Sequence, residues 1–404
     1  MERRVVVTGV GVVSALGKNA CEFWQALIAA QSGIGPITQV DMTDIKFKNG
    51  AEVRDWDPSE YFEGKRPDFL DRFAQFAVVA AREAVKDAGI EWNSTLRERT
   101  AIVTGSCIGG QSSQDAGFQD LYLFKKGRLS PLTISRVMPN AGASCISIEM
   151  GIGGPAFTLS TACSSANHAI GQAFRMVRAG DVEMALAGGS EAPLNFGHLK
   201  AWESLRVVAP DTCRPFSVDR LGMVLGEGGA ILVLEPREAA VARGAKIYGE
   251  IVGFGMSSDA SHLTQSSSQG ASRAIDGAMR DAGLAPEQIG YINAHGTATL
   301  LNDPMEVAAI RLALGQRADR IPISSTKSMH GHALGAAGAI EAIATVLALK
   351  NCTLPPTANF TTIDPRCDMD VIPNTARHAD VEYALSNSFA FGGLNAVLAF
   401  KSPR

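Results

Sequence analysis

Residues 159–180, LSTACSSANHAIGQAFRMVRAG, are matched later in the chain by residues 324–350, SSTKSMHGHALGAAGAIEAIATVLALK. Both stretches begin with Ser-Thr at the end of a predicted strand and continue through small residues into a long helix. A second pair follows in the same order, MALAGGSEA (184–192) and YALSNSFAFGG (383–393), each predicted as a short strand after such a helix. The repeated unit predicts a duplicated α/β fold. Chance similarity between Gly/Ala-rich turns is the alternative.

The rest of the chain supports two α/β halves. Its 404 residues, 46% of them apolar, exceed the length at which one core usually stops growing. A β-branched run at 4–16, an amphipathic helix at 70–89 ending in Gly89, and a strand at 101–104 alternate as in α/β proteins with buried sheets. We expect an N-terminal half, residues 1–249, and a C-terminal half, residues 250–404.

Charge and cysteine usage exclude several classes of protein. The formal net charge is −4, with 19% charged residues, which argues against nucleic-acid binding. The seven cysteines are odd in number and form no C-x-x-C pair, as expected in a reducing cytosol rather than in a disulfide framework. No signal-peptide region precedes the first strand, and no uncharged apolar run is long enough to span a membrane. We therefore expect a cytoplasmic protein that is not associated with a membrane.

Cys163 lies in the first stretch, between strand-like residues 156–159 and a predicted helix that ends at Gly180. A cysteine at a helix N-terminus meets unpaired N–H groups and the positive end of the helix dipole, which stabilise a thiolate and lower its pKa. Small neighbouring residues leave room for a substrate. The pattern predicts a nucleophile, and a small buried core cysteine is the alternative.

His295 and His332 share the topological position of Cys163, because each follows a predicted strand. In α/β sheets, ligands collect at this edge. A metal site of His330, His332 and His295 is an alternative, but no clear carboxylate or thiolate set completes it, so we expect no metal.

A thiol and two imidazoles at one edge fit one chemistry. A thiolate accepts an acyl group from a thioester, and decarboxylation of a malonyl thioester supplies the carbanion equivalent for carbon–carbon bond formation. The developing enolate oxygen needs fixed hydrogen-bond donors, which two imidazole N–H groups provide. The residues therefore favour a decarboxylative Claisen condensation.

Four ordered motifs resemble those of the β-ketoacyl-[acyl-carrier-protein] synthases of the thiolase superfamily, in particular the elongating class II type. The motifs are STACSSA (160–166), NAHGT (293–297), KSMHGHALGAAGAIE (327–341) and NSFAFGGLNA (387–396). The resemblance covers nearly the whole chain. It implies a thiolase-like α/β fold in which the duplicated halves form a layered α-β-α-β-α core, and an acyltransferase activity.

The resemblance also implies roles for individual residues. Cys163 corresponds to the acylated nucleophile, and His295 and His332 correspond to the pair that polarises the malonyl carbonyl and assists decarboxylation. Lys327 and Glu341 correspond to an active-site lysine and its accompanying carboxylate, a partly buried pair. A surface ion pair of little energetic value is the alternative.

Further implied roles concern the acyl pocket. The backbone N–H groups of Cys163 and Phe391 would form an oxyanion hole, and Phe389 and Phe391 match a mobile gating loop. Core packing is the alternative for Phe389. Residues expected to contact substrate are Phe389, Phe391, Ile108, Thr297 and Thr133, the last from a neighbouring subunit.

The family implies an acyl carrier protein as partner, with substrates carried on its phosphopantetheine arm and no organic cofactor. It also implies a homodimer, while some specialised members form a heterodimer with a chain-length factor homologue. The carrier is acidic, so its docking patch is expected to be basic. Lys65, Arg128 and Arg206 occupy positions that resemble this patch, with ordinary solvated surface cations as the alternative.

Several positions depart from the family pattern without touching the Cys-His-His set. They are Leu394, Ala390, His330, Ser217 and Met223, together with the loop 298–303, ATLLND, which is more apolar than usual. Several lie near the expected acyl gate or pantetheine entrance. They indicate a specialised synthase, as in nodulation-factor, polyene or polyketide pathways, rather than housekeeping fatty acid elongation.

Three other interpretations fit the residues less well. A coenzyme A-dependent thiolase would need a second cysteine in the C-terminal half, but Cys352 and Cys367 lie outside the repeated sites. A non-catalytic chain-length partner would have lost the nucleophile, yet Cys163 is present. A starter-type synthase with a Cys-His-Asn set is disfavoured because position 332 is histidine.

Overall fold

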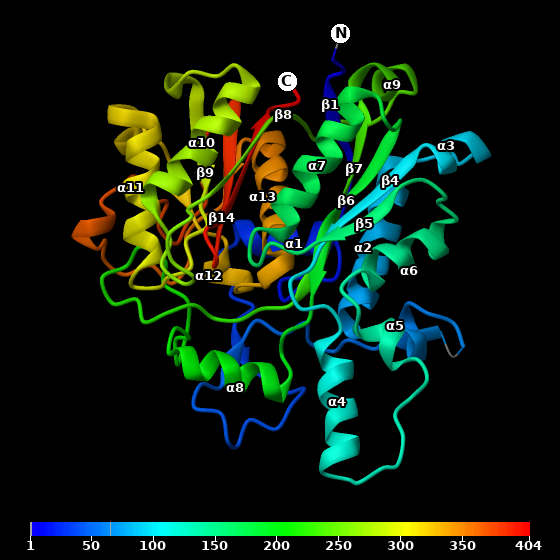
Figure 1. Ribbon diagram of the computed structural model, residues 1–404. Coiled ribbons are helices and arrows are strands. Elements are labelled where there is room, and N and C mark those ends of the chain that lie inside the picture. Colours follow the sequence, from blue (N-terminus) through cyan, green and yellow to red (C-terminus); the bar gives the residue numbers. More distant parts are fainter. Residues whose placement is uncertain (1, 65) are drawn as a thin grey trace.

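The computed structural model describes residues 2–64 and 66–404, and within this part of the chain ten strands form one mixed sheet (Figure 1). The strand order is β10-β9-β13-β14-β8-β1-β7-β6-β4-β5. The strands of this sheet are β1 (Val5–Ser14), β4 (Thr100–Gly105), β5 (Ala156–Leu159), β6 (Met184–Glu191), β7 (Gly228–Pro236), β8 (Gly249–Ser258), β9 (Ile289–Asn293), β10 (Ile323–Ser324), β13 (Tyr383–Ala390) and β14 (Leu394–Lys401). Two short pairs stand apart, β2 (Gly35–Pro36) with β3 (Asn49–Gly50) and β11 (Thr353–Leu354) with β12 (Arg377–His378).

The sheet consists of two halves with the same topology. In the first, β4 lies parallel to both β5 and β6, and β7 runs antiparallel between β6 and β1. In the second, β9 lies parallel to β10 and β13, and β14 runs antiparallel between β13 and β8. Antiparallel pairing of β1 with β8 joins the halves. The repeated segments fall on equivalent strands, β6 and β13, so the predicted duplication is confirmed and chance similarity is wrong.

The helices cover both faces of the sheet. They are α1 (Ala20–Ile28), α2 (Arg72–Ala88), α3 (Ser94–Glu98), α4 (Gln111–Tyr122), α5 (Thr133–Val137), α6 (Ala141–Met150), α7 (Ser165–Ala179), α8 (Phe196–Leu205), α9 (Arg237–Ala242), α10 (Ser268–Ala282), α11 (Asn302–Leu314), α12 (Lys327–His330) and α13 (Ala337–Asn351). The equivalent helices α7 and α13 contact each other between the half-sheets, while α2 and α10 pack on the outer faces. The order of layers is the predicted α-β-α-β-α core.

Alternating side chains of the strands separate the buried core into layers. On β7, Leu232 and Leu234 join the central core with α7 and α13, whereas Ile231 and Val233 join the outer core with α2. A third core forms between the second half-sheet, α10 and α11. This two-residue period is what a strand buried on both faces requires.

Glycines in the strands let the outer helices lie directly on the sheet. A Cβ atom on Gly11 of β1 would lie 2.0 Å from the carbonyl oxygen of Ala80 on α2. In the second half, a Cβ atom on Gly255 of β8 would lie 2.0 Å from the carbonyl oxygen of Ala274 on α10. The two halves therefore use the same close approach at equivalent positions. Helix α2 ends as predicted at Gly89, which adopts the left-handed conformation with φ 62°.

Among the described residues, one stretch is long and apolar enough to be compared with a membrane span. It runs from Leu334 to Asn351, has a mean hydropathy of 1.3 and is 89% buried inside the protein. It includes α13, whose burial between the two half-sheets accounts for its apolar character.

Candidate active site

Cys163 lies in a tight turn between β5 and α7, two residues before the first residue of that helix. The preceding residue, Ala162, has a positive φ of 51°, which a residue with a Cβ atom rarely adopts. Ser164 fixes the turn, because its hydroxyl donates to the carbonyl oxygens of Thr161 and Leu394, each at 2.8 Å. The Leu394 bond ties the cysteine turn to the start of β14.

The thiol of Cys163 is only 8% exposed, and this burial decides its acidity. Desolvation raises the pKa of Cys163 to about 11, while the charge of Lys327 and the backbone N–H groups of Phe391 and Cys163 oppose the rise. The prediction that the helix terminus lowers this pKa is therefore wrong for the free enzyme. The thiolate loses more free energy through desolvation than it gains from the nearby N–H dipoles and the charge of Lys327.

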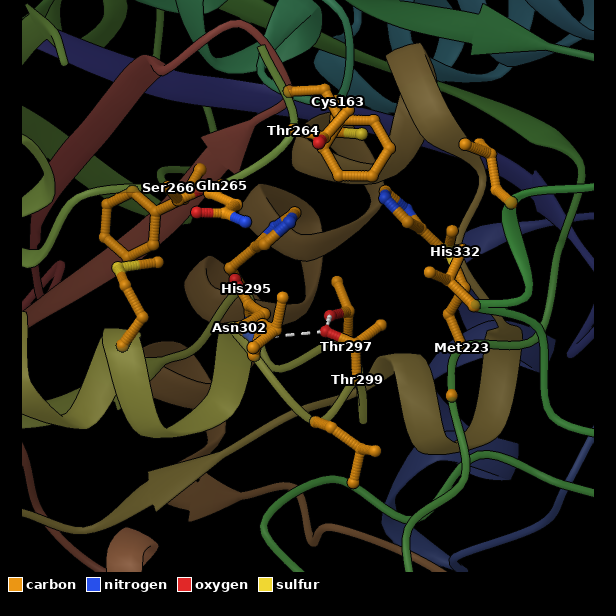
Figure 2. A pocket seen from close by; sticks show the side chains of 18 of the residues that line it. Cys163, Met223, Thr264, Gln265, Ser266, His295, Thr297, Thr299, Asn302 and His332 are labelled. Atoms are coloured by element: carbon orange, nitrogen blue, oxygen red, sulfur yellow. Dashed lines mark hydrogen bonds between the residues drawn. The ribbon is translucent and has the colours of Figure 1, made fainter. Parts of the chain in front are cut away.

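Two histidines enter the same cavity from separate loops. His295 follows β9, and its backbone N–H donates to Oε1 of Glu306 on α11 at 2.8 Å. His332 follows α12, and its backbone N–H donates to the carbonyl oxygen of Val224 at 2.7 Å. The ring centroids of the histidines lie 5.4 Å apart with the planes at 86°. Figure 2 shows both rings and the thiol of Cys163 turned toward one space.

A fully buried ion pair lies behind His295. Lys327 and Glu341 contact each other, and neither side chain is exposed, so the interpretation as a surface pair is wrong. Burial raises the pKa of the Glu341 carboxyl, and Lys327 opposes that rise. Burial and the charge of Lys327 lower the pKa of both His295 and His332 well below the usual value, so both imidazoles are neutral near pH 7.

The contact with Lys327 also selects a tautomer of His295. Nζ of Lys327 lies 3.4 Å from Nδ1 of His295. An ammonium group has no lone pair and can only donate, so Nδ1 accepts and Nε2 carries the proton. Both ring nitrogens of His332 are buried and have no hydrogen-bond partner within the described chain. The two rings therefore offer polar atoms that remain available to a substrate.

The cavity has a volume of about 570 Å³ and holds most of the predicted residues. Those that line it are Cys163, His295, His332, Thr297, Phe389, Phe391 and Arg206. Ile108 and Thr133 are not among its lining residues: the backbone N–H of Ile108 donates to Glu191, and Thr133 begins α5. Arg128 is exposed in the segment between α4 and α5, and Lys65 lies outside the described residues.

The two phenylalanines of the predicted gating loop have different surroundings. Phe389 is 3% exposed, belongs to the outer core of the second half, and meets His295 edge-on with centroids 6.2 Å apart. Phe391 stacks against Trp202 of α8 at 6.1 Å between centroids. The indole Nε1 of Trp202 donates to Nε2 of His198 at 2.8 Å, and burial lowers the pKa of His198 to about 4, which keeps that ring a neutral acceptor.

Four of these residues were not identified from the sequence. Thr299 lines the cavity, and its hydroxyl lies 3.1 Å from that of Thr297. The Thr-x-Thr pattern beside the histidine motif is the sequence signal that could have identified it. Glu306 has no signal beyond its place on an acidic helix start. Trp202 and His198 carry no local pattern, since α8 reaches the site only through packing with Phe391.

Two of the alternatives lack support in the geometry. Nε2 of His330 bonds the hydroxyl of Thr326 at 2.9 Å, so His330 does not join His295 and His332. Among the described residues, no group of three or more His, Cys, Asp or Glu side chains is placed to hold a metal ion. Neither Cys352 nor Cys367 lines the cavity, so a thiolase-type second cysteine has no candidate there among the described lining residues.

Comparison with known families agrees with this geometry. Residues 2–240 match the family model "Beta-ketoacyl synthase, N-terminal domain", and residues 248–361 match "Beta-ketoacyl synthase, C-terminal domain". The chain belongs to the β-ketoacyl synthase family. The predicted enzyme class, an acyltransferase of the 3-oxoacyl-[acyl-carrier-protein] synthase type, is therefore confirmed.

Individual relatives match this synthase over nearly the whole chain. Nodulation protein E of Rhizobium sp. (strain N33) is 45% identical over 401 residues, 99% of this chain and 100% of the relative. The 3-oxoacyl-[acyl-carrier-protein] synthase 2 of Synechocystis sp. is 43% identical over 410 residues, 99% of this chain and 98% of the relative. Among solved structures, the ishigamide ketosynthase/chain length factor matches with a TM-score of 0.96 and 37% identity over 100% of both chains. The predicted thiolase-like fold is confirmed by this likeness.

Proposed function

We propose that this synthase elongates an acyl chain by decarboxylative Claisen condensation with malonyl-acyl carrier protein, with Cys163 as the acylated nucleophile. The observation that carries the proposal is the convergence of Cys163, His295 and His332 on one cavity. The family membership supplies the reaction class, and the geometry of the three side chains supports the division of labour that follows.

The first step is transfer of the acyl group to Cys163. The thiol proton passes to a neutral imidazole in the cavity, because the free thiol holds its proton near pH 7. The sulfur attacks the thioester carbonyl, and the backbone N–H groups of Cys163 and Phe391 stabilise the oxyanion. Collapse of this intermediate leaves the acyl group on Cys163 and returns the carrier thiol with the proton.

The second step is decarboxylation of the malonyl thioester. His295 donates a hydrogen bond from its Nε2–H to the malonyl carbonyl oxygen, since the contact with Lys327 leaves the proton on that nitrogen. His332, whose ring nitrogens are free of protein partners, is the second donor. Carbon dioxide leaves, and the electron pair of the broken bond forms an enolate whose oxygen these donors stabilise.

The third step forms the new carbon–carbon bond. The enolate carbon attacks the carbonyl of the acyl group on Cys163, and the same backbone N–H groups stabilise the second oxyanion. The carbon–sulfur bond to Cys163 then breaks. The products are a β-ketoacyl thioester on the carrier and a thiolate that takes a proton from solvent to regenerate the free enzyme.

The carrier delivers each substrate on its phosphopantetheine arm, and no further organic cofactor takes part in this scheme. Thr297 and Thr299 both line the cavity, and their hydroxyls are proposed to bond the amides of the arm. Arg206, exposed at the rim, and Arg128 are proposed carrier contacts. We assign the nucleophile to an N-terminal half, residues 1–249, and the histidines to a C-terminal half, residues 250–404, in a cytoplasmic enzyme.

The working form is proposed to be a dimer formed along the β5 edge of the sheet. Strand β5 ends the hydrogen-bonded order, and α4, α5 and α6 nearby expose large apolar side chains. These are Phe118, Tyr122, Leu123, Ile134, Met138 and Ile148. Such a surface suits either a second copy or a chain-length factor homologue, as in the ketosynthase/chain length factor it resembles. Thr133 begins α5 and would reach a partner's acyl pocket across this contact.

The substrate is proposed to be a specialised acyl chain. Met223, one of the departing positions, lines the cavity and borders the proposed substrate path. The relation to Nodulation protein E at 45% identity supports this interpretation. A non-catalytic chain-length role is the second candidate, but it would not require a thiol and two neutral imidazoles facing one cavity.

Intact-protein mass spectrometry with acyl-carrier-protein thioesters of graded length and unsaturation tests the proposal. The wild type is expected to gain one acyl group, and Cys163→Ala to gain none. Cys21→Ala removes an exposed cysteine remote from the cavity and is the matched control, with an unchanged adduct.

The histidine roles have a separate readout. Cys163→Ala should retain malonyl decarboxylation, whereas His295→Ala and His332→Ala should retain acylation of Cys163 while losing decarboxylation. Condensation that persists in Cys163→Ala would contradict the assignment. Absence of any adduct on the wild type would instead favour the non-catalytic role.

A further inference from the structure

Four leucines line the active-site cavity while remaining exposed to solvent. Leu205, Leu221, Leu300 and Leu301 all line the cavity and expose 48, 57, 56 and 69% of their surface. We call them the leucine collar. Single exposed leucines are ordinary on protein surfaces, but four exposed leucines that line one cavity are the kind of apolar surface that marks an interaction site.

The loop that carries Leu300 and Leu301 is fixed from beneath. Nε of Arg220, a fully buried side chain, donates to the carbonyl oxygen of Thr299 at 3.1 Å. The backbone N–H of Asn302 donates to the hydroxyl of Thr299 at 3.2 Å. These bonds hold both ends of the turn, so the two leucines have little freedom to fold inward and bury themselves.

The residue that opens this loop is held in an unfavourable backbone conformation. Ala298 has a positive φ of 64°, and its N–H donates to Oδ1 of the buried Asp303 at 3.1 Å. A residue with a Cβ atom in this region costs about 1–3 kcal/mol and persists only where the surroundings impose it. The fold therefore holds in place a loop that exposes Leu300 and Leu301 to water. Contact with a partner protein would explain why these leucines are exposed.

The lining of the cavity carries little charge. Arg206 is the sole Lys, Arg, Asp or Glu among the described residues that line the cavity. A docking site built on charge alone would need several cations here, because single exposed ion pairs contribute little. The chemistry of the collar instead suits apolar side chains with one acidic group beside Arg206.

We propose that the leucine collar docks an apolar face of the acyl carrier protein, with an acidic side chain of that face against Arg206. The inference rests on the proposed function, because a thioester arm that reaches Cys163 through this opening must be held by a carrier seated on its rim. The amide groups of the arm itself match the threonines deeper in the cavity and not four exposed leucines. The collar thus adds an apolar component to carrier recognition at a position where the sequence departs from the family pattern.

Steady-state condensation kinetics of Leu300→Ser/Leu301→Ser test this docking surface. Two donors are compared, malonyl-acyl carrier protein and the malonyl thioester of N-acetylcysteamine, which has no carrier. The KM for the carrier-bound donor is expected to rise about tenfold, equivalent to ~1.4 kcal/mol, with kcat unchanged. The kcat/KM with the carrier-free donor should stay within about twofold of the wild type. Because apolar contacts are not screened by salt, the ratio of variant to wild-type KM should be the same at low and high ionic strength.

Leu312→Ser is the matched control, since Leu312 is 58% exposed on α11 and does not line the cavity. It should leave both donors unaffected. An unchanged KM for the carrier-bound donor in the double variant would overturn the proposal, and so would an equal loss with both donors, which would place the leucines against the arm. Failure of the proposed function looks different, because the wild type would then produce no β-ketoacyl product from either donor.

Discussion

Removal of the Lys327 charge tests whether the buried ion pair controls the tautomer of His295. In Lys327→Met, Glu341 stays fully buried without its cation, a change that typically costs about 3–5 kcal/mol of unfolding free energy. For a chain of 404 residues this corresponds to a fall in Tm of about 4–6 °C. Lys327→Met/Glu341→Gln removes the orphaned carboxylate as well, and we expect it to recover most of the lost stability.

Catalysis should not recover with stability. In the wild type, the Lys327 ammonium lies 3.4 Å from Nδ1 of His295 and keeps the lone pair on that nitrogen. Without the ammonium, the ring proton is free to move from Nε2 to Nδ1. One donor to the enolate oxygen is then weakened, which costs about 10²–10³ in kcat for decarboxylation. The charge also lowers the pKa of Cys163, so its loss raises that pKa and slows acylation at neutral pH.

The assay compares three quantities in wild type, single and double variants: Tm, the rate of carbon dioxide release from malonyl-carrier protein, and the rate of Cys163 acylation. The expected pattern in Lys327→Met/Glu341→Gln is near wild-type Tm with decarboxylation reduced at least a hundredfold. Near wild-type decarboxylation in that variant would refute the reasoning, because it would show that His295 keeps its active tautomer without Lys327.

Three further predictions follow from individual contacts. Trp202→Leu removes a stacking contact of about 1 kcal/mol from Phe391, and the ratio of long-chain to short-chain acylation rates, measured by mass spectrometry, should change about fivefold. Because burial raises the pKa of Cys163 to about 11, the thiolate fraction grows with pH, so its alkylation by iodoacetamide should accelerate about tenfold per pH unit from 7 to 9, and a plateau in that range would contradict the raised pKa. In Gly171→Ala the new methyl would lie 2.4 Å from the Phe254 ring, so urea unfolding should show a loss of about 1–3 kcal/mol despite the better helix propensity of alanine.

The repeated strand-to-helix pattern was sufficient to predict the fold class because it is local. Strands, helices and the glycine that ends α2 follow from periodicity and capping within short windows of sequence. The pairing of β1 with β8 instead joins residues that are far apart in the sequence, since Val5 lies opposite Ile251 in the sheet. No local signal specifies that contact, which depends on how the two finished halves meet.

The candidate site divides in the same way. Cys163, His295 and His332 were selected because each was expected to follow a strand, although in the structure α12 lies between β10 and His332. The acidity of Cys163 was predicted with the wrong sign, because the helix terminus is visible in the sequence but the depth of burial is not. Trp202 was not predicted as a site residue for a related reason. Its role depends on a stacking contact with Phe391, 189 positions away in the sequence.

Chemistry and substrate delivery rest on separate parts of this molecule. In the proposed mechanism, charge develops on Cys163, His295 and the substrate inside the cavity, and the buried pair of Lys327 and Glu341 lies behind His295. Some of the departures from the family pattern line the cavity: Met223 on its wall, and Leu300 and Leu301, which are exposed to solvent. A substitution at the opening can change which carrier or chain is accepted without moving the histidines. Specialisation by this route alters KM and leaves kcat intact, because transition-state stabilisation is confined to groups that the opening does not touch.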